Sequence, residues 1–282
     1  MLGRRGVLLT GGIVGAVSLK RGVISPRVAG CAAASSSAPT AGAENTNITV
    51  YQYKICPFCS KVKTYLDYLK VPYDTVEVNP LTKGELGFSK DYKKVPIMMV
   101  GPENQQINES DQIIAFITAN LKAKEKAGAS FFPQDTEKWA EWSDKRLAVM
   151  LYPNITRSFA ESWECFEYVD SVSTWNVANR FVTRAAGTVA MSLANGKIKK
   201  KYNIVDERAE LKATLAEWTS AVGKKKYLHG DHVTLPDLLV FGVLRSISGL
   251  STFREIMADN ADLSAWYGRV DLSLVSMAKT SK

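Results

Sequence analysis

Cysteine and histidine are scarce in this chain, which limits the sites it can build. Among 282 residues there are four cysteines and two histidines. Four cysteines are few for the disulfide framework of a secreted domain, so we expect a reducing compartment. A zinc site needs further ligands beside the one close cysteine pair, and the remaining candidates form no second pair. The sequence therefore predicts no metal site. The remaining candidates are Cys31, Cys165, His229 and His232.

Long hydrophobic runs are also lacking. The apolar run at residues 7–19 is too short to span a bilayer comfortably. It lies in a leader, residues 1–46, that is basic and serine-rich and has one acidic residue, Glu44. Such a segment is typical of a peptide that targets a protein to an organelle, a chloroplast or a mitochondrion. A secretory or twin-arginine signal and an uncleaved membrane anchor are the alternatives, because Arg4 and Arg5 precede the run.

The net charge of +8 does not single out nucleic acid as a partner. The leader has five basic residues and one acidic residue, so it contributes +4 of that total. The basic runs at residues 197–201 and 224–226 are typical of solvated helix ends. We expect a mildly basic folded body that binds no nucleic acid.

The stretch with the most specific chemistry is Cys56-Pro57-Phe58-Cys59. Residues 48–53 are β-branched and aromatic, as in a strand, and the residues after Pro57 are apolar at helical spacing. Proline is tolerated at the first position of a helix, so Cys56 falls at the helix cap. Unpaired backbone donors and the helix dipole stabilise a thiolate there. Cys56 is the predicted nucleophilic or redox thiol, with Lys54, Lys61 and Lys63 adding positive potential; a metal half-site and a structural cysteine pair are the alternatives.

The residues that follow predict a small α/β domain at residues 47–121. Residues 73–78 alternate as a second strand, which a right-handed crossover makes parallel to the first. A weak helix is predicted at residues 81–92, and a hairpin of two short strands at 97–107. Glu109 and Ser110 open a further helix, with serine as a helix cap whose backbone amides form an anion site.

This order of elements resembles a thioredoxin-like fold of the glutaredoxin and glutathione transferase type. In that superfamily, the backbone before a cis proline pairs with the cysteinyl part of glutathione, and an acidic-serine pair holds its γ-glutamyl end. The resemblance implies that Val95, Pro96, Glu109 and Ser110 bind glutathione in this chain.

A second, all-α domain is predicted at residues 137–282, after a charged linker at 122–136. An apolar stripe that ends at Pro153 indicates one helix, and residues near 159–169, 175–195 and 205–222 indicate three more. Thr234 and Asp237 form a helix-capping pattern of a kind found in glutathione transferase helical domains. We interpret both as structural. His229 and His232 are interpreted as loop histidines without a carboxylate partner and without a catalytic role.

Several stretches resemble the membrane-associated prostaglandin E synthase type 2 family more closely. They are residues 51–62, 76–80, 93–97 and 238–250. The resemblance implies that Cys56 acts on a lipid endoperoxide and that Tyr53 and Phe58 support the reaction. It also implies glutathione, haem bound together with glutathione, and association with a membrane.

Three hypotheses about function therefore stand. The first is an isomerase that converts a lipid endoperoxide. The second is a glutathione-dependent thiol oxidoreductase or transferase, in which Cys56 attacks a glutathione mixed disulfide or an electrophile and Cys59 resolves the disulfide. The third is a protein that binds haem or glutathione without turnover. The expected partners are a small lipid or glutathione-conjugated substrate, a peripheral membrane surface and, because transferase-like folds often dimerise, a second copy of the chain.

Overall fold

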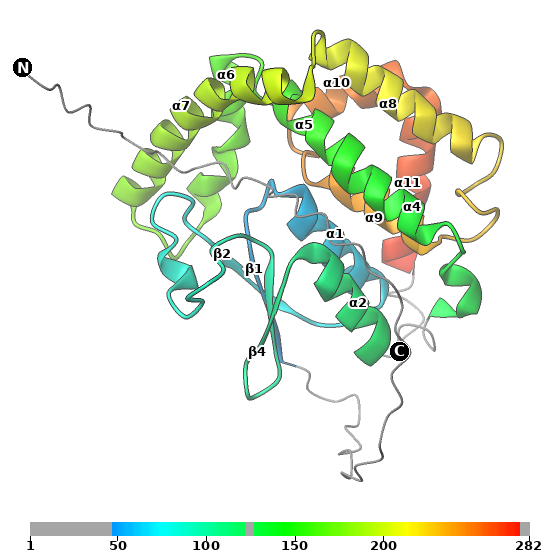
Figure 1. Cartoon of the computed structure of the whole chain (residues 1–282), viewed down its shortest axis with the longest axis horizontal. Helices are drawn as coiled ribbons and strands as arrows, with labels where there is room; N and C mark the ends of the chain where they lie inside the picture. The colour runs from blue at the N-terminus through cyan, green and yellow to red at the C-terminus, as the bar shows by residue number, and fades with distance from the viewer. Residues whose placement is uncertain (1–46, 122–126, 277–282) are drawn as a thin grey trace, which may run out of the picture. The chain divides into compact units, whose positions relative to one another are not determined.

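The computed structural model describes residues 47–121 and 127–276 (Figure 1). All of them lie within one compact unit of the chain, Asn45–Lys282. The predicted targeting leader, with Cys31, lies outside the described residues, as does the first part of the predicted linker. The domain limits at residues 121 and 137 stay a prediction.

A four-stranded sheet forms the first part of the fold, in the order β2-β1-β3-β4. β1 (Ile48–Gln52) pairs in parallel with β2 (Asp74–Glu77) and antiparallel with β3 (Ile97–Val100). β3 also pairs antiparallel with β4 (Gln105–Asn108). The predicted parallel pair and the predicted hairpin are therefore confirmed. Alternate residues of β1 are buried, which is the period expected of a strand with one face on a core.

Two helices accompany the sheet, and a third that we predicted is absent. α1 (Pro57–Tyr68) connects β1 to β2, and α2 (Ser110–Asn120) follows β4. The prediction of a helix at residues 81–92 was wrong, because only a single 3₁₀ turn, η1 (Gly84–Leu86), forms there. The Asn79 side chain accepts the backbone N–H groups of Leu81 and Thr82, a local bond that competes with a helix.

The second part of the fold is helical, as predicted. The helices near 159–169 and 205–222 are confirmed, while the one at 175–195 extends to residue 202 because its lysine run continues the helix. The helical elements are η2 (Ala129–Phe131), α4 (Thr136–Trp142), η3 (Ser143–Leu147), α5 (Ala148–Asn154), α6 (Phe159–Cys165), η4 (Glu167–Ser171), α7 (Val177–Tyr202), α8 (Glu207–Val222), α9 (Leu235–Arg245), α10 (Ser251–Asp259) and α11 (Ala261–Ser276).

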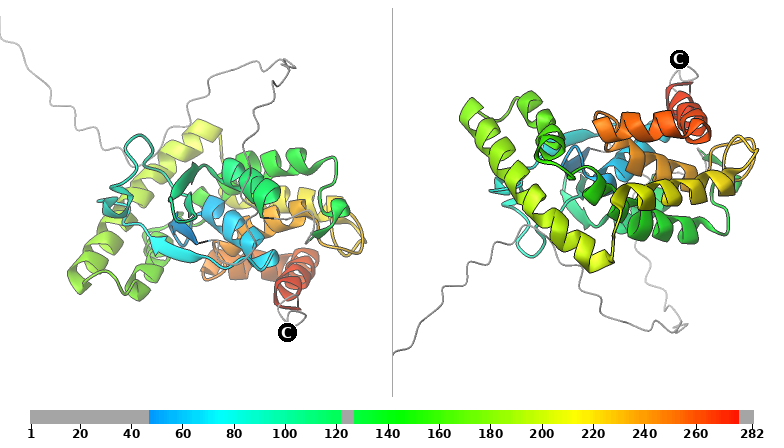
Figure 2. Two further views of the ribbon diagram at one scale, coloured as in Figure 1. Left: turned by 90° about the horizontal axis from the view of Figure 1, so that it is seen from below. Right: turned by 90° about the horizontal axis from the view of Figure 1, so that it is seen from above.

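The two parts meet where α1 packs along α9, the blue and orange helices of Figures 1 and 2. Every residue of α9 from Leu235 to Leu244 is buried. A Cβ on Gly242 would lie 2.7 Å from the Lys61 Cα, so glycine allows the two backbones to approach. The Arg245 Nη1 donates to the Asp67 Oδ2 at 2.5 Å and ties the end of α9 to α1.

A π-helical turn, η3, interrupts the run from α4 to α5 and carries Asp144 toward α1. There the side chain of Lys61, which is fully buried, forms an ion pair with Asp144. α5 continues one residue beyond Pro153, slightly past the predicted end. Among the described helices, none combines the length and the apolar character that a membrane crossing requires.

The predicted cap of α9 is confirmed. The Asp237 carboxylate accepts the backbone N–H of Thr234 at 3.1 Å and its hydroxyl at 2.7 Å. His229 is a loop histidine, as predicted, but the prediction that it lacks a carboxylate partner was wrong. Its Nε2 lies 2.8 Å from the Asp135 Oδ1, which tertiary folding brings from the start of α4.

Candidate active site

The register of the sheet brings the predicted site segments to one edge. Tyr51, Ile97 and Asn108 form one row across β1, β3 and β4. Three segments continue from this row at the same edge of the sheet. They are residues 53–59 after β1, Val95 and Pro96 before β3, and Glu109 and Ser110 after β4. Three segments that are far apart in the sequence therefore end side by side.

Cys56 occupies the cap position of α1, as predicted, and is partly exposed. A hydrogen bond from the Cys59 thiol lowers the pKa of Cys56 the most, against the opposing effect of burial. The backbone N–H groups of Cys59 and Phe58 and the positive charge of Lys63 lower it further. The thiolate of Cys56 is thus stabilised by the first turn of its own helix.

Cys59 is fully buried, and burial raises its pKa well above the ordinary value, with the hydrogen bond to Cys56 acting in the same direction. Both cysteines are free thiols. Because Cys59 keeps its proton, it serves as the donor and Cys56 as the acceptor of the pair. The two cysteines are therefore chemically unequal.

Tyr53 directly follows β1 and lies three residues before Cys56. Burial raises the pKa of its phenol, and the charges of Cys56 and Cys59 raise it further, so the phenol is neutral. Its ring packs against the small cluster that Val78 and Ile97 build. Among the described residues, no hydrogen bond joins its hydroxyl to Cys56, so this phenol can donate to another molecule.

Phe58 lies in the first turn of α1 with its ring partly buried, and the Lys61 Nζ lies 5.6 Å from the ring centre. The expectation that Lys61 adds positive potential to the thiol stays a prediction. Its ammonium is buried between Asp144 and Asp111, which neutralise it locally. The charge of Lys63 lowers the pKa of Cys56.

The predicted glutathione segment contains a cis peptide bond between Val95 and Pro96. Within the described ranges, no protein hydrogen bond reaches the backbone N–H or carbonyl of Val95. Ser110 is buried but does not cap its helix as predicted. Glu109 occupies the cap position with a φ of 64°, in the left-handed region, and Ser110 is the first helical residue. Backbone N–H groups of the first turn of α2 thus remain open to an anion.

Two groups at the centre were not predicted. Glu77 ends β2 beside Gln52, and its Oε1 accepts the backbone N–H of Lys54 at 2.7 Å. Burial raises the pKa of Glu77 to about 7. Its place could have been inferred, since the carboxyl ends of two parallel strands meet at one edge. Burial and the negative charge of Glu77 raise the pKa of Tyr168 of η4 well above its ordinary value, and no sequence signal indicated this neighbour.

Two curated relatives decide the family. A prostaglandin E synthase 2 of Danio rerio is 31% identical over 79% of this chain and 70% of its own length. A prostaglandin E synthase 2 of Mus musculus is 30% identical over 80% of this chain and 70% of its own length. The chain belongs to the prostaglandin E synthase 2 family. Membership agrees with the resemblance carried by the residues around Cys56.

Further comparisons place this prostaglandin E synthase 2 family member in a known fold. A model of the glutathione S-transferase N-terminal domain matches residues 50–125. Glutathione transferase F7 of Populus trichocarpa has a TM-score of 0.52 at 13% identity, over 83% of this chain and 99% of its own. Glutathione S-transferase III has a TM-score of 0.51 at 18% identity, over 82% and 96%. The predicted thioredoxin-like domain followed by a transferase-like helical domain is confirmed.

His229 is not free to ligate a haem iron. The two ring nitrogens of His229 contact Thr234 and Asp135. Within residues 47–121 and 127–276, no three His, Cys, Asp or Glu side chains are arranged to hold a metal ion.

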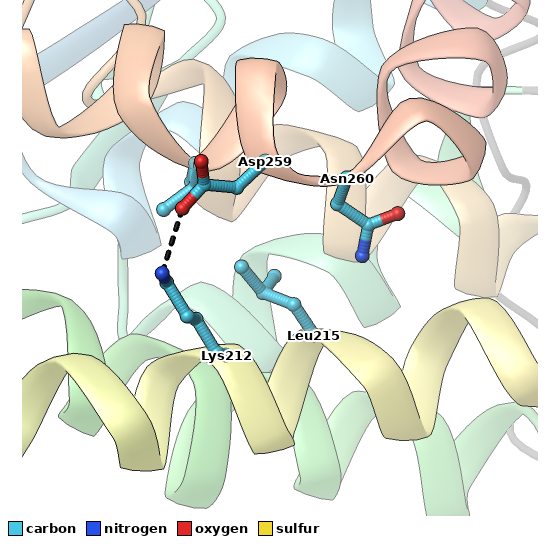
Figure 3. A pocket seen from close by; sticks show the side chains of 5 residues that line it. Lys212, Leu215, Asp259 and Asn260 are labelled. Carbon is cyan, nitrogen blue, oxygen red and sulfur yellow. Dashed lines mark ion pairs between the residues drawn. The ribbon is translucent and has the colours of Figure 1, made fainter.

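A separate hollow of about 340 Å³ lies between α8 and α10 (Figure 3). Lys212 and Asp259 form an ion pair across it at 2.7 Å, and both side chains are largely exposed. No predicted site residue lines it, so it does not belong to the Cys56 centre. Its lining consists of Lys212, Leu215, Ile256, Asp259 and Asn260.

Proposed function

We propose that this member of the prostaglandin E synthase 2 family is a glutathione-associated thiol enzyme that isomerises a lipid endoperoxide, of the prostaglandin H2 to E2 type, at Cys56. The observation that carries the proposal is the pair of unequal thiols. Cys56 is accessible with a lowered pKa, and Cys59 is buried with a raised one. The names of the two animal relatives support the choice of substrate class.

The proposed isomerisation needs a base, an acid and no external oxidant. The Cys56 thiolate takes the proton from the carbon that bears one endoperoxide oxygen. The electron pair of that C–H bond forms the carbonyl, and the O–O bond breaks. The other oxygen leaves as an alkoxide and takes up a proton. Tyr53 holds a neutral phenol that can hydrogen-bond to a substrate oxygen.

Glutathione fits the same edge of the sheet. The free backbone groups of Val95 can pair with a peptide, as a strand edge does. Ser110 and the N-terminus of α2 suit a carboxylate, while Glu109 suits an amine. We expect Ser110→Ala to weaken glutathione binding about tenfold, measured by titration calorimetry. The matched control is Ser273→Ala in α11, which should bind like the wild type.

A thiol oxidoreductase is the second candidate, and the bond between the two thiols favours it. Cys56 would attack a glutathione mixed disulfide and release the other thiol. Cys59, having given its proton to the departing thiolate, would then attack the Cys56–glutathione disulfide and release glutathione, leaving a Cys56–Cys59 disulfide. A thiol reductant of the glutathione class would reduce that disulfide and complete the cycle.

Activity assays on the full chain separate the two functions. Cys56→Ala should abolish both endoperoxide isomerisation and turnover of a glutathione mixed disulfide. Cys59→Ser should retain most of the isomerisation, because a hydroxyl still donates to Cys56, and should lose any disulfide turnover that needs a resolving thiol. Isomerisation that survives Cys56→Ala would refute the first function. Binding of glutathione or haem without either reaction would favour the third hypothesis.

α7 supplies a surface for peripheral contact with an anionic membrane, from which a lipid substrate would come. Its apolar side chains Phe181, Val182 and Leu193 are 65%, 54% and 72% exposed. The helix has no acidic residue, and lysines fill its last turn. We expect the protein to bind phosphatidylserine vesicles. The Val182→Asp substitution and high salt should each weaken this binding. Light scattering of the same samples tests the homodimer, and loss of dimer in the variant would instead assign α7 to a second copy.

We propose that the leader is a targeting peptide that directs the protein to an organelle. Residues 1–46 fused to a fluorescent protein should direct it to a chloroplast or mitochondrion. Secretion of the fusion would instead support the signal-peptide alternative.

A further inference from the structure

The turn between β1 and α1 carries both groups of the proposed reaction. The Cys56 N–H donates to the Tyr53 carbonyl at 2.9 Å, and the Cys56 carbonyl accepts the Ser60 N–H at 3.0 Å as α1 begins. The thiol and the Tyr53 phenol therefore leave the backbone from the two ends of one four-residue turn. The bond that closes this turn does not use the N–H of Lys54, which needs another acceptor.

Glu77 supplies that acceptor from the neighbouring strand. Its Oε1 accepts the Lys54 N–H at 2.7 Å, and its Oε2 accepts the Gln52 Nε2 at 3.1 Å. Gln52 and Glu77 are partners in the parallel register of β1 and β2, and the Val78 N–H donates to the Gln52 carbonyl at 2.9 Å. The carboxylate is thus anchored by the sheet and bonds the turn just beyond it.

The amide of Gln52 is oriented by its bond to Glu77. Gln52 is 6% exposed and lies on the same face of β1 as Ile48 and Val50, which belong to the main core. Its Oε1 is buried and has no partner among the described residues. Such an atom costs about 1–3 kcal/mol. Turning the amide would set this oxygen against the Glu77 carboxylate, so the orphaned oxygen follows from the bond to Glu77.

The side chains of the turn are not deeply packed. Lys54 is exposed, and Tyr53, Ile55 and Cys56 are only partly buried. Hydrogen bonds to the backbone of the turn therefore matter more for its shape. The bond from the Lys54 N–H to a carboxylate is charge-assisted, and such bonds are about twice as strong as neutral ones. It lies one residue after the phenol and two residues before the thiol.

The shape of this turn matters for both proposed reactions. In the isomerisation, Cys56 takes a proton from the substrate while Tyr53 hydrogen-bonds an oxygen of the same molecule. In the disulfide reaction, the turn sets the line along which the Cys56 sulfur attacks. A misplacement of about 1 Å can cost about a hundredfold in rate. A group that holds the turn therefore contributes to the rate without touching the substrate.

We propose that Glu77 is a positioning residue, which holds the turn so that Cys56 and Tyr53 meet one substrate together. It acts through its bond to the Lys54 N–H, and it neither contacts the substrate nor transfers a proton. The assignment deepens the proposed function and rests on it, because the turnover at Cys56 is what the position of the turn promotes.

Two substitutions separate reach from charge at this position. Glu77→Gln keeps an oxygen for the Lys54 N–H, and its new N–H group can donate to the Gln52 Oε1 once the Gln52 amide turns. Glu77→Asp keeps the charge but is one methylene shorter, so it no longer reaches the turn. In the full chain, we expect Glu77→Gln to keep most of the wild-type kcat, whereas Glu77→Asp and Glu77→Ala should lose about a hundredfold.

Further measurements exclude a general loss of structure. Titration calorimetry should give the wild-type affinity for glutathione, because Val95 and Ser110 lie on other segments. Alkylation of Cys56 by iodoacetamide should be retained, since that reaction needs the thiolate alone. Glu164→Ala is the matched control. The Glu164 Oε1 accepts the Ser251 N–H at 2.8 Å in the helical part, so this variant should lose stability and keep the wild-type kcat.

Each outcome decides the question. Low kcat in Glu77→Asp and Glu77→Ala, with activity in Glu77→Gln and with alkylation retained, supports the assignment. If Glu77→Ala fails to fold, the comparison of Glu77→Asp with Glu77→Gln decides alone. A loss in Glu77→Gln as large as in Glu77→Asp overturns the assignment, because it shows that the carboxylate itself is needed.

The proposed function can stand when the assignment does not. Wild-type kcat in Glu77→Ala overturns the assignment, and an inactive Cys56→Ala then leaves the proposed function in place. Joint loss of kcat, Cys56 alkylation and glutathione binding in the Glu77 variants would show a merely structural role and also overturns it. A wild-type protein with neither reaction overturns the function and the assignment together.

Discussion

At the scale of single residues, Cys56 and Cys59 show how position alone changes one side chain. Cys56 lies at the cap of α1, where backbone N–H groups and a thiol donor surround its sulfur. Cys59 lies one turn further along, fully buried, where charge is disfavoured. The difference separates a nucleophile from a hydrogen-bond donor within four residues.

Cys59→Ala should reduce the reactivity of Cys56. The lost S–H donor is the largest contribution to the lowered pKa of Cys56, so that pKa should rise and the thiolate fraction at pH 7 should fall. We expect alkylation by iodoacetamide to slow by about a factor of ten for each unit of pKa. Peptide mass spectrometry would follow Cys56 separately. Cys59→Ser is the control, since it keeps a donor. Equal rates for wild type and Cys59→Ala would assign the shift to the backbone of α1.

Glu77 should make the protein less stable as the pH rises. Its folded pKa of about 7 exceeds the ordinary 4.5, so the folded state holds the proton more tightly than the unfolded state. That contribution to stability is complete below pH 4.5 and is lost as the pH rises toward 7. We expect the unfolding free energy of wild type, relative to Glu77→Gln, to fall by about 2 kcal/mol from pH 5 to 8. Urea denaturation of both proteins at the two pH values would measure this difference. The same change in unfolding free energy with pH in wild type and in Glu77→Gln would contradict the prediction.

At the scale of elements, the contact of α1 with α9 holds the catalytic helix in place. Gly242 allows close approach, Lys61 is buried against η3, and Arg245 binds Asp67. The cap of α1 carries Cys56, so a displacement of this helix would move the thiol. The helical part therefore contributes to the site through the position of α1.

Gly242→Ala should destabilise the protein. The new Cβ would lie 2.7 Å from the Lys61 Cα and 3.0 Å from its backbone nitrogen, so α1 and α9 must separate. We expect a loss of about 1–3 kcal/mol in unfolding free energy, as in overpacked cores. Gly268→Ala in α11 is the control. No atom lies within 4 Å of its Cβ, and alanine should add about 0.5–1 kcal/mol there. A denaturation midpoint of Gly242→Ala at or above that of the wild type would refute the close approach of α1 and α9.

At the scale of the whole molecule, Asp237 connects segments that are distant in sequence. Its buried carboxylate caps α9 and also accepts the Leu228 N–H and the Trp266 Nε1 of α11, both at 3.0 Å. One side chain thus joins the loop before α9, the core helix and the last helix. Neighbouring α8 presents Trp218, which packs against Trp266.

Asp237→Asn should weaken the helical part. The amide places a donor where the carboxylate now accepts four hydrogen bonds, so at least one buried N–H loses its partner. We expect a cost of about 2–3 kcal/mol by urea denaturation. Asp231→Asn is the control, because Asp231 is 75% exposed and its pair with Lys226 should contribute less than about 1 kcal/mol. Equal losses in the two variants would show that the shared contacts do not act as inferred.

The sequence by itself determined the features that depend on neighbouring residues. Strand and helix periods fixed β1 and α1, proline after Cys56 fixed the cap, and Thr234 with Asp237 fixed the start of α9. The same local signals failed at residues 81–92, where the Asn79 side chain competed with a helix, and at Ser110, where the backbone of Glu109 took the cap position.

Only the tertiary structure decided which distant side chains complete the site. The pairing of Lys61 with Asp144 depends on how η3 packs, and the pairing of Arg245 with Asp67 on how α9 packs; no periodic pattern encodes those approaches. Burial then set the protonation of each group, because the cost of removing a charge from water depends on surroundings that form only on folding. The sequence thus located the thiol, and the fold assigned its acids and bases.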